Sequence, residues 1–502
     1  MKSHETPVLI VGGSLVGLSA AMLLGVHGVR AVLVEPHLGS SPHPRAIGYT
    51  PRTMEVFAQA GIVSKIPRIP PGFRLIRQRV ESLAGKWFES SSWTPAKPGR
   101  AEPEIEIEHS PYTGAAIAQD ALEPILREHA RELGADLRLG TSLVSFEQDG
   151  DGVTAHLRDR SGREHTLRAA YMIAADGNES GVREALGVRR KGPGHLITMR
   201  SVLFRAPLES YLERGVSQFD IEQPGLDAFL TTYGDGRWVL MFKDDVERDA
   251  DTLRACITKA VGADVPIEII TTGRWELTAL VADAFSAGRV FLAGDAAHTL
   301  PPTRGGYGAN TGIHDVHNLA WKLARVLADK APHALLDSYD TERRPIAWTR
   351  LEQTFARPDY AKHGRGFAAD VEILDETAIE LGQIARSSVI LGSDTNVPVA
   401  ARPDVWRGEP GTRAPHVRVG EGSALDAFGR AFVLVTGDAA WRVAAERVGL
   451  DVLDANDAVS DAFGIGAVGA SLVRPDGVVA WRTTDAVDRD ETLRDVMARV
   501  GA

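Results

Sequence analysis

Cysteine is almost absent from this 502-residue chain, in which Cys256 is the single example. One thiol excludes an intrachain disulfide, a thiol redox pair and a zinc site built from cysteines. Cys256 lies in residues 251–262, whose pattern is helical. We expect a buried and unreactive thiol there, because a lone cysteine behaves as a small hydrophobic side chain.

Long hydrophobic runs and basic clusters are also missing. No window approaches about 18 uncharged apolar residues, and Met1 leads into only a short apolar run, so we expect a cytoplasmic protein without a membrane span. A net charge of −11 without a Lys/Arg cluster argues against a nucleic-acid partner. Between residues 187 and 275 no carboxylate pair, Ser/His/Asp set or histidine cluster indicates a nucleophilic or metal site, and no metal is expected.

The composition is that of an ordinary globular protein. Hydrophobic residues make up 44% of the chain and charged residues 25%. At roughly 150 residues per domain, this length predicts two to four domains.

The first motif joins two predicted strands near the N-terminus. Residues 7–11 form one strand, residues 31–34 form the next, and Glu35 ends it. The loop and helix start between them read Gly12, Gly13, Ser14, Leu15, Val16 and Gly17. Glycines at this position let a pyrophosphate approach the backbone, and a terminal acid meets ribose hydroxyls. Ser14 replaces the second glycine of G-x-G-x-x-G, and its hydroxyl can itself donate to phosphate. Glu35 favours FAD or NAD over NADP.

A second motif follows the buried strand predicted at residues 171–175. That strand ends in Asp176 and Gly177, with Ser180 and Arg183 shortly after. A turn with a helix cap would account for Asp, Gly and Ser on structural grounds. It does not account for a second strand that ends in Asp-Gly with Ser and Arg at a fixed short spacing.

Two polar residues lie between these motifs. Arg45 stands in a Pro-Arg-Ala segment, where a solvated surface charge is the usual role. Gln119 stands at the start of a helix predicted over residues 119–132, either as a residue near the cap or as a polar group turned to a ligand.

The third motif begins with a short apolar strand at residues 290–293, closed by Gly294 and Asp295. The segment that follows contains Pro301, Pro302, Gly305, Gly306, Gly308 and Asn310. Its glycines permit close approach of a ligand, and we expect the next helix to begin near Thr311 with its positive end toward an electron-rich or anionic ring. An ordinary strand-to-helix turn is the alternative.

The rest of the chain predicts two further units. Residues 187–275 contain short β-like runs, which we interpret as a second sheet with Tyr233, Trp238 and Phe242 in its core. We expect a helix over residues 334–343 that stops at Pro345, and further helical segments between residues 348 and 390. Residues 391–412 read as a linker to a third unit at residues 413–502.

Together the three motifs resemble those of the class A FAD-dependent aromatic hydroxylases, over roughly residues 5–345. The tail, at residues 463–466 and 470–477, extends the resemblance to actinomycete hydroxylases of aromatic polyketides, the aklavinone 11-hydroxylase type. Two features depart from the family pattern, namely Ser14 and Arg304, which precedes the glycine pair.

The resemblance implies a fold and a cofactor. The fold is α/β: a Rossmann-like FAD-binding domain (residues 1–186 and 276–390), an inserted β-sheet substrate domain (residues 187–275) and a thioredoxin-like C-terminal domain without cysteine (residues 413–502). It places Glu35 at the adenosine ribose, Asp295 at the ribityl chain, residues 302–308 at the isoalloxazine ring and Asp176-Gly177 at both the flavin pyrophosphate and NAD(P)H. The implied FAD-binding residues are Gly12, Ser14, Leu15, Gly17, Glu35, Arg45, Gln119, Leu143, Asp176, Gly177, Asp295, Pro302, Gly305, Gly308 and Asn310.

The resemblance also implies an activity. NADPH or NADH would reduce the FAD, dioxygen would give a flavin hydroperoxide, and an oxygen atom would pass to a polycyclic aromatic polyketide of the anthracyclinone or angucyclinone type. The implied protein is a monomer or homodimer, with no catalytic side chain assigned. Alternatives that share the motifs are a Baeyer-Villiger oxygenase, an enzyme that inactivates a rifamycin or tetracycline, a flavin oxidoreductase that does not activate oxygen, and a flavin-bearing protein that sequesters a ligand without turnover.

Overall fold

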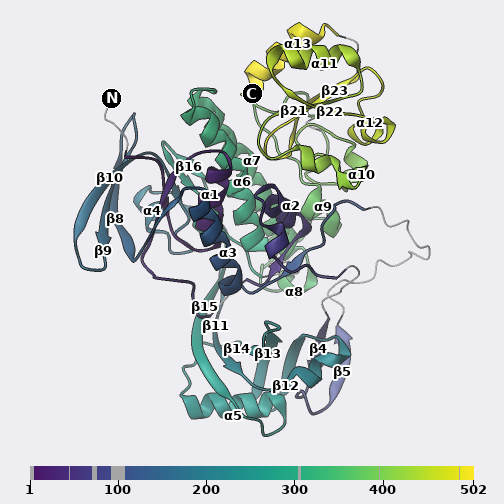
Figure 1. The fold of residues 1–502 in the computed structure, drawn as a ribbon. Helices are drawn as coiled ribbons and strands as arrows, with labels where there is room; N and C mark the ends of the chain where they lie inside the picture. The colour runs from purple at the N-terminus through teal and green to yellow at the C-terminus, as the bar shows by residue number, and fades with distance from the viewer. Residues whose placement is uncertain are drawn as a thin grey trace.

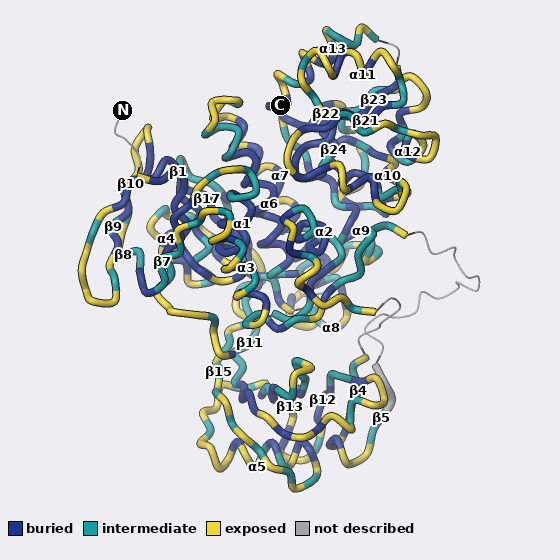
Figure 2. The backbone as a smooth tube through the Cα atoms, in the orientation of Figure 1, coloured by how far each residue is buried: buried dark blue, intermediate teal, exposed yellow. Residues whose placement is uncertain are grey.

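A computed structural model describes residues 5–43, 46–70, 76–91, 108–302, 307–394, 396–485 and 487–501. Figure 1 shows three units: a central α/β unit, a β-sheet unit below it in the view, and a C-terminal α/β unit above it. In Figure 2 buried backbone runs through the sheet of each unit, so each unit has its own core. This is the fold class that the sequence predicted.

A largely parallel sheet lies at the centre of the first unit. Its strands follow the order β16-β17-β10-β1-β2-β7, with β8 and β9 extending it from β10. Neighbours β17, β10, β1, β2 and β7 all pair in parallel, so their carboxyl ends share one edge. The strands are β1 (Thr6–Val11), β2 (Ala31–Glu35), β7 (Asp136–Leu139), β8 (Thr141–Gln148), β9 (Val153–Asp159), β10 (Glu164–Ala174), β16 (Ser286–Ala287) and β17 (Val290–Leu292).

Apolar side chains on both faces explain why these strands occupy the centre. Val8, Leu9 and Ile10 of β1 are fully buried, and so are Met172 and Ala174 of β10. A parallel strand covered by helices on both sides needs this continuous apolar run.

Helices α1 (Leu15–Val26), α3 (Gln119–Glu132) and α6 (Tyr307–Leu327) pack beside this sheet, with α1 in contact with both others. The described part of α6 begins at Tyr307, so the prediction of a start near Thr311 is wrong. Gly308 and Asn310 are therefore helical. The remaining elements of this unit are β3 (Gly48–Tyr49), β6 (Ala115–Ala116), α2 (Pro51–Gln59) and α4 (Gly181–Ala185).

Helix α7 (Asp337–Phe355) contradicts the predicted stop at Pro345, because it continues through that proline. Buried side chains before and after Pro345, including Tyr339, Arg343, Ala347 and Leu351, hold the helix against its neighbours. This packing outweighs the one backbone hydrogen bond that the proline removes. After α7 only α8 (Pro358–Ala361) and α9 (Glu376–Leu381) are helical up to residue 390, far less than the sequence predicted.

The second unit is a sheet in the order β18-β15-β11-β14-β13-β12-β4-β5, with α5 (Ala250–Val261) on one face. Trp238 and Phe242 lie in the core between this sheet and α5, as predicted, while Cys256 on α5 is only partly buried. The strands are β4 (Arg77–Val80), β5 (Trp87–Ser91), β11 (Arg190–Arg205), β12 (Gln218–Gln223), β13 (Leu226–Thr232), β14 (Arg237–Phe242), β15 (Glu268–Ala282) and β18 (His298–Thr299).

The C-terminal unit has a four-stranded sheet in the order β22-β21-β23-β24. The segment before it packs along this sheet: Leu391 N–H donates to the carbonyl of Ala480 (2.7 Å) and Gly411 N–H to that of Val479 (2.8 Å). Its elements are α10 (Pro403–Trp406), β19 (Arg418–Val419), β20 (Gly422–Ser423), β21 (Val433–Thr436), α11 (Ala439–Val448), β22 (Asp451–Asp454), α12 (Asp457–Phe463), β23 (Ala470–Val473), β24 (Val479–Thr483) and α13 (Arg489–Val500). None of the helices in the described ranges has the length and apolar character needed to cross a bilayer.

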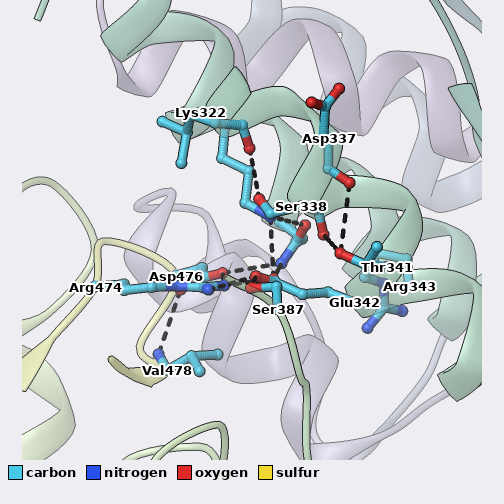
Figure 3. A network of polar contacts seen from close by, with 12 residues as sticks. Lys322, Asp337, Ser338, Thr341, Glu342, Arg343, Ser387, Arg474, Asp476 and Val478 are labelled. Carbon is cyan, nitrogen blue, oxygen red and sulfur yellow. Dashed lines mark hydrogen bonds and ion pairs between the residues drawn. The ribbon is translucent and has the colours of Figure 1, made fainter. Parts of the chain in front are cut away.

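A buried polar network joins the C-terminal unit to α6 and α7 (Figure 3). The carboxylate of Glu342 on α7 accepts hydrogen bonds from Arg474 Nη1 (2.8 Å) and Nη2 (2.9 Å), Lys322 Nζ (3.0 Å), Asn318 Nδ2 (2.6 Å) and Ser387 Oγ (2.7 Å). The side chains of Glu342, Lys322 and Arg474 are fully buried. Buried charges persist only when they are paired in this way, so the network requires the two units to dock in one arrangement.

His317 on α6 makes the stability of this core dependent on pH. It is 4% exposed, its Nε2 lies 2.7 Å from Gln59 Oε1, and burial lowers its pKa from 6.5 to about 3. Between these two values the unfolded chain binds a proton that the folded chain does not, so the free energy of unfolding falls as the pH falls.

We expect His317 to remove ~2 kcal/mol of stability at pH 5 relative to pH 8. The variant His317→Gln cannot bind that proton and should lose correspondingly less stability over the same interval. Urea unfolding of both proteins at the two pH values tests this, and the difference at pH 8 isolates the cost of the changed contact with Gln59. Identical pH dependence in the two proteins would contradict the prediction.

Candidate functional site

The shared edge of the central sheet brings the three sequence motifs together. The glycine loop follows β1, Glu35 ends β2, Asp176 and Gly177 follow β10, and Asp295 follows β17. Ligands of open parallel sheets bind outside the carboxyl ends of the strands, where loops of several βα units meet. The site is therefore built from residues far apart in the sequence.

The glycine loop is shaped so that no side chain fits in it. Gly12 has a φ of +105°, and a Cβ there would lie 2.2 Å from the carbonyl oxygen of Ala175. A Cβ on Gly17 would lie 1.9 Å from the carbonyl oxygen of Gly12. The Gly13 N–H donates to Glu35 Oε2 (2.7 Å), which holds the loop against the end of β2.

The N-terminus of α1 has no side-chain cap. Ser14 occupies the N-cap position, but its hydroxyl donates to Glu123 Oε1 (2.7 Å) instead of accepting from the helix. The backbone N–H groups of the first turn, which includes Leu15, are consequently available to an anion, as a pyrophosphate group would require. The Ser14 hydroxyl, which we expected to be able to donate to phosphate, therefore donates to Glu123.

Glu123 is a residue that the sequence reasoning missed. It is 2% exposed on α3 and also accepts from Gln119 Nε2 (2.8 Å), whose second contact is Ser14 Oγ (2.8 Å). Gln119 thus lies beside the glycine loop. The available signal was the spacing of Gln119 and Glu123, which places both side chains on one face of a helix.

The Asp176 carboxylate has one used and one unused oxygen. Oδ2 accepts from the N–H of Val182 (3.1 Å), whereas Oδ1 is buried without a hydrogen-bond partner among the described residues. Gly177 follows with a φ of +85°. A buried acceptor without a donor is costly, so this oxygen is suited to a bound group that carries one.

Arg183 joins the second motif to the third. Its Nη1 donates to the carbonyl oxygens of Asn178 (3.0 Å) and Ala296 (3.2 Å), while Ser180 caps its backbone N–H (2.9 Å). The fixed spacing of Ser180 and Arg183 after Asp-Gly therefore has a structural explanation. It locks two of the three loops together.

Asp315 positions the third motif and was also missed. This fully buried carboxylate on α6 accepts from the N–H of Gly294 (3.2 Å), from Arg343 Nε (2.9 Å) and from His298 Nε2 (2.6 Å). Burial raises its pKa, but the charges of His298 and Arg343 outweigh that effect and hold the pKa below its usual range. The turn so fixed leaves Asp295 exposed at the sheet edge.

The first turn of α6 holds the segment between β3 and α2. Asn310 is fully buried, accepts from Thr50 N–H (3.0 Å) and Thr53 Oγ1 (2.6 Å), and donates to the Gly48 carbonyl (3.2 Å). These three partners are protein groups. Gly308, two positions earlier, is half-buried at the helix start.

The other predicted cofactor residues lie in different surroundings. Pro302 is exposed, and its carbonyl accepts from the Tyr360 hydroxyl (2.8 Å). Leu143 on β8 is half-buried against the central core, shortly after Gly140, whose N–H donates to the Glu35 carbonyl (2.7 Å). Arg45, Gly305 and the divergent Arg304 lie outside the described residues.

His43 connects this site to the second unit. It is 8% exposed, its Nε2 lies 2.9 Å from Ser201 Oγ on β11, and its ring stands edge-on to Trp275 at 5.9 Å. A Cβ on Gly273 would lie 2.9 Å from Ser201 Oγ and 3.0 Å from the His43 ring. The glycine therefore leaves a pit in the sheet into which His43 fits.

The face of the second sheet opposite α5 is turned toward the central unit (Figure 1). Phe229, Thr231 and Met241 are neighbours on this face by strand register, and all three are only half-buried. Arg77 pairs with Asp220 and stacks over the Phe229 ring at 4.5 Å. This face offers apolar and cationic surface above the sheet edge that carries the motifs.

These features fit an extended dinucleotide that carries a flat ring system. Its diphosphate would fit against Gly12 and Gly17, where no side chain obstructs the backbone, and at the uncapped start of α1. The Asp176 oxygen that has no described partner suits a ribose hydroxyl. Asp295 and the first turn of α6 lie toward the other end, where the helix dipole favours negative charge.

Comparison with known proteins agrees with this geometry. A model of the FAD binding domain matches residues 5–354, and one of the aromatic-ring hydroxylase C-terminal region matches residues 407–501. The chain is 38% identical to a 4-methyl-5-nitrocatechol 5-monooxygenase of Burkholderia sp, over 99% of this chain and 97% of that protein. It is 39% identical to an aklavinone 12-hydroxylase of Streptomyces purpurascens, over 100% and 99%. The solved structure of aklavinone-11 hydroxylase with FAD and aklavinone matches with a TM-score of 0.87 and 37% identity, over 100% of this chain and 99% of that one.

The glycine loop supplies a direct test of the cradle. Gly12→Ala would force its new methyl group into the Ala175 carbonyl and give alanine an unfavourable φ. We expect about 3 kcal/mol or more of FAD binding free energy to be lost, a factor of ~100 in Kd. Flavin absorbance of the purified protein and titration with FAD measure the effect.

Gly28→Ala is the matched control for this test. Gly28 also has a positive φ (+75°), but nothing lies within 4 Å of a Cβ placed there. We expect a small loss of stability and unchanged FAD affinity. Equal FAD affinity in the two variants would show that the loop does not hold the cofactor.

Proposed function

We propose that this chain, which belongs to the FAD-dependent aromatic-ring hydroxylases, is a monooxygenase that hydroxylates a phenolic ring of a polycyclic aromatic polyketide. The observation that carries the substrate class is the similarity to aklavinone-11 hydroxylase in complex with FAD and aklavinone, at a TM-score of 0.87 over the whole chain. NADPH or NADH would supply the electrons, and dioxygen the oxygen atom that is transferred.

The three motifs would hold FAD along the edge of the central sheet. In this proposal Glu35 binds the adenosine ribose, and the loop from Gly12 to Gly17, with the free N–H groups of α1, binds the pyrophosphate. Asp176, Gly177 and Asp295 contact the groups between pyrophosphate and flavin, and the remaining contacts come from Arg45, Gln119, Leu143, Pro302, Gly305, Gly308 and Asn310. Bound FAD supplies the redox and oxygen chemistry.

The protein's own contribution would be positioning and electrostatics. The first described turn of α6 would direct the positive end of the helix toward a bound flavin ring and favour negative charge there. The half-buried face of the second sheet, with Phe229 and Met241, would lie over the substrate and exclude water. Arg77, stacked on Phe229, would favour a phenolate or another electron-rich oxygen of the substrate.

A smaller substrate is the second candidate. The relative from Burkholderia sp that is 38% identical over 99% of this chain is a 4-methyl-5-nitrocatechol 5-monooxygenase. A nitrocatechol is a single electron-poor ring that carries two phenolic oxygens, so it would make fewer apolar contacts with the sheet than a polycyclic substrate. The nitrocatechol monooxygenase and aklavinone-11 hydroxylase both match nearly the whole chain, so the comparisons do not separate the two candidate substrates. Substrate profiling is the measurement that does.

A cytoplasmic location fits this proposal, because NADPH and NADH are supplied there. A monomer or a homodimer is proposed for the active form, since every motif that the proposal uses lies within one chain.

The activity is tested by incubating purified, flavin-loaded protein with anthracyclinones, angucyclinones and nitrocatechols. We expect a polycyclic phenol to accelerate NAD(P)H oxidation by about tenfold or more, as an activating substrate does in an enzyme that commits to oxygen transfer only when the substrate is bound. Label from 18O2 should appear in the product. Acceleration by nitrocatechol alone would favour the second candidate, and no label in any phenol would contradict the monooxygenase assignment.

The pit at Gly273 predicts a positioning role for His43, whose segment leads to Arg45. Gly273→Ala would push His43 out of the sheet, and a displacement of about 1 Å near a reacting centre costs up to ~100-fold in rate. We expect a lower yield of product per NAD(P)H oxidised, with unchanged FAD content.

The control for this variant is Gly150→Ala, because Gly150 has no atom within 4 Å of a Cβ and lies in a turn far along the chain. It should keep the wild-type yield. A wild-type yield in Gly273→Ala as well would contradict the positioning role of His43.

A further inference from the structure

A polar cavity lies behind the described site, at the junction of the central and C-terminal units. It has a volume of about 70 Å³ and is bounded by α6, α7 and the segment after α9 on one side, and by residues 411–413 and 476–478 on the other. Its lining includes four arginines and only two carboxylates.

Arg350 is a buried cation without an ion-pair partner among the described residues. Its side chain is 1% exposed, and its three acceptors are all neutral: Gln383 Oε1 (3.0 Å), Thr311 Oγ1 (2.9 Å) and the Ile379 carbonyl (3.4 Å). An unpaired buried charge costs several kcal/mol, so a guanidinium in this position needs a counter-charge nearby.

Two hydrogen-bond donors on the lining are also unused. Gln383 Nε2 and Arg413 Nη1 are both buried and have no acceptor within the described part of the chain. The bond from Arg350 to Gln383 Oε1 fixes the orientation of that amide, so its NH2 group is the end left over. The other nitrogens of Arg413 are occupied by Glu55 and by the His109 carbonyl.

The buried charges of this region do not balance. Arg52 and Arg413 share one carboxylate, Glu55. Described cations in and around the cavity outnumber the described carboxylates by one, the cations being Arg52, Lys322, Arg343, Arg350, Arg413 and Arg474 and the carboxylates Glu55, Asp315, Glu342, Glu380 and Asp476.

The other titratable groups on the lining do not correct this imbalance. Burial lowers the pKa of both His314 and His317, so both rings are neutral at pH 7. Burial also raises the pKa of Glu380, which lies within electrostatic range of Arg350 without forming an ion pair. A protonated Glu380 would enlarge the positive excess and add a further donor.

We propose that this cavity binds one small monovalent anion, of the size of chloride, between Arg350, Gln383 and Arg413. A water molecule occupies ~30 Å³, so a cavity of about 70 Å³ has room for such an ion. The ion would accept hydrogen bonds from the two unused donors and neutralise the excess charge. It would bridge α7 and the segment after α9 to the C-terminal unit and so stabilise their docking.

The first test is thermal unfolding of the flavin-loaded protein in sodium chloride and in sodium gluconate at equal ionic strength. A ligand that binds only the folded state raises the Tm, and the rise grows with the logarithm of its concentration above Kd. We expect chloride and bromide to raise the Tm and gluconate to leave it unchanged. Crystals grown in sodium bromide should show one anomalous peak within the cavity.

Gln383→Glu is the discriminating variant. It replaces the amide with a carboxylate beside Arg350 and thereby supplies the missing negative charge covalently. We expect its Tm in gluconate to reach or exceed that of the wild type in chloride, with no further response to chloride. Gln353→Glu is the control, because Gln353 is an amide on α7 that is more deeply buried than Gln383 and does not line the cavity, and it should keep the chloride response.

Three outcomes would overturn the proposal. Equal Tm values of the wild type in chloride and gluconate, with only water density in the cavity, would mean that water alone fills it. A chloride response that Gln383→Glu retains would place the ion elsewhere. A bromide peak outside the cavity with none inside it would do the same. These readouts do not depend on which substrate the enzyme hydroxylates.

Discussion

The arrangement of the site depends on the buried carboxylate of Asp315. It lies on α6, yet its three hydrogen-bond partners come from the turn after β17, from β18 and from α7. One side chain thereby fixes the turn that presents Asp295, the first turns of α6 and the helix that carries Arg350. Because the carboxylate is fully buried, any shift that broke one of these bonds would leave a charge without compensation. The third motif is therefore rigid at the point where its backbone must meet a ligand.

Polar contacts join the units in addition to apolar packing, in which Trp321 of α6 stands edge-on to Phe432 of the C-terminal core at 5.5 Å. Glu342 receives donors from the C-terminal unit, Arg237 of the second sheet pairs with Asp120 at the start of α3 (2.6 Å), and His43 reaches Ser201. Such contacts specify orientation more strictly than apolar surfaces, because a misplaced partner leaves a buried polar group unsatisfied. The position of the second sheet over the site follows from this requirement.

Local patterns predicted the elements that were built from strong periodicity. The βαβ start at residues 6–35 and the helix over residues 119–132 have the predicted type and nearly the predicted bounds. The errors arose where packing overrode a local signal. α6 begins before Thr311, α7 passes through Pro345 because buried side chains precede and follow the proline, and Cys256 is only partly buried although its helix packs on the sheet.

The sequence by itself determined the class of cofactor and the strand ends at which its motifs lie, because glycine spacing, strand ends and terminal acids are local features that one short segment can display. It could not show that Asp315, Glu123 and Arg183 join the three motifs, since their partners lie far away in the sequence and each residue alone has an ordinary structural role. The tertiary structure alone decided which charges meet. Only in the folded chain are Arg350, Gln383 and Arg413 brought to one cavity, and whether buried cations are balanced depends on neighbours that no local pattern encodes.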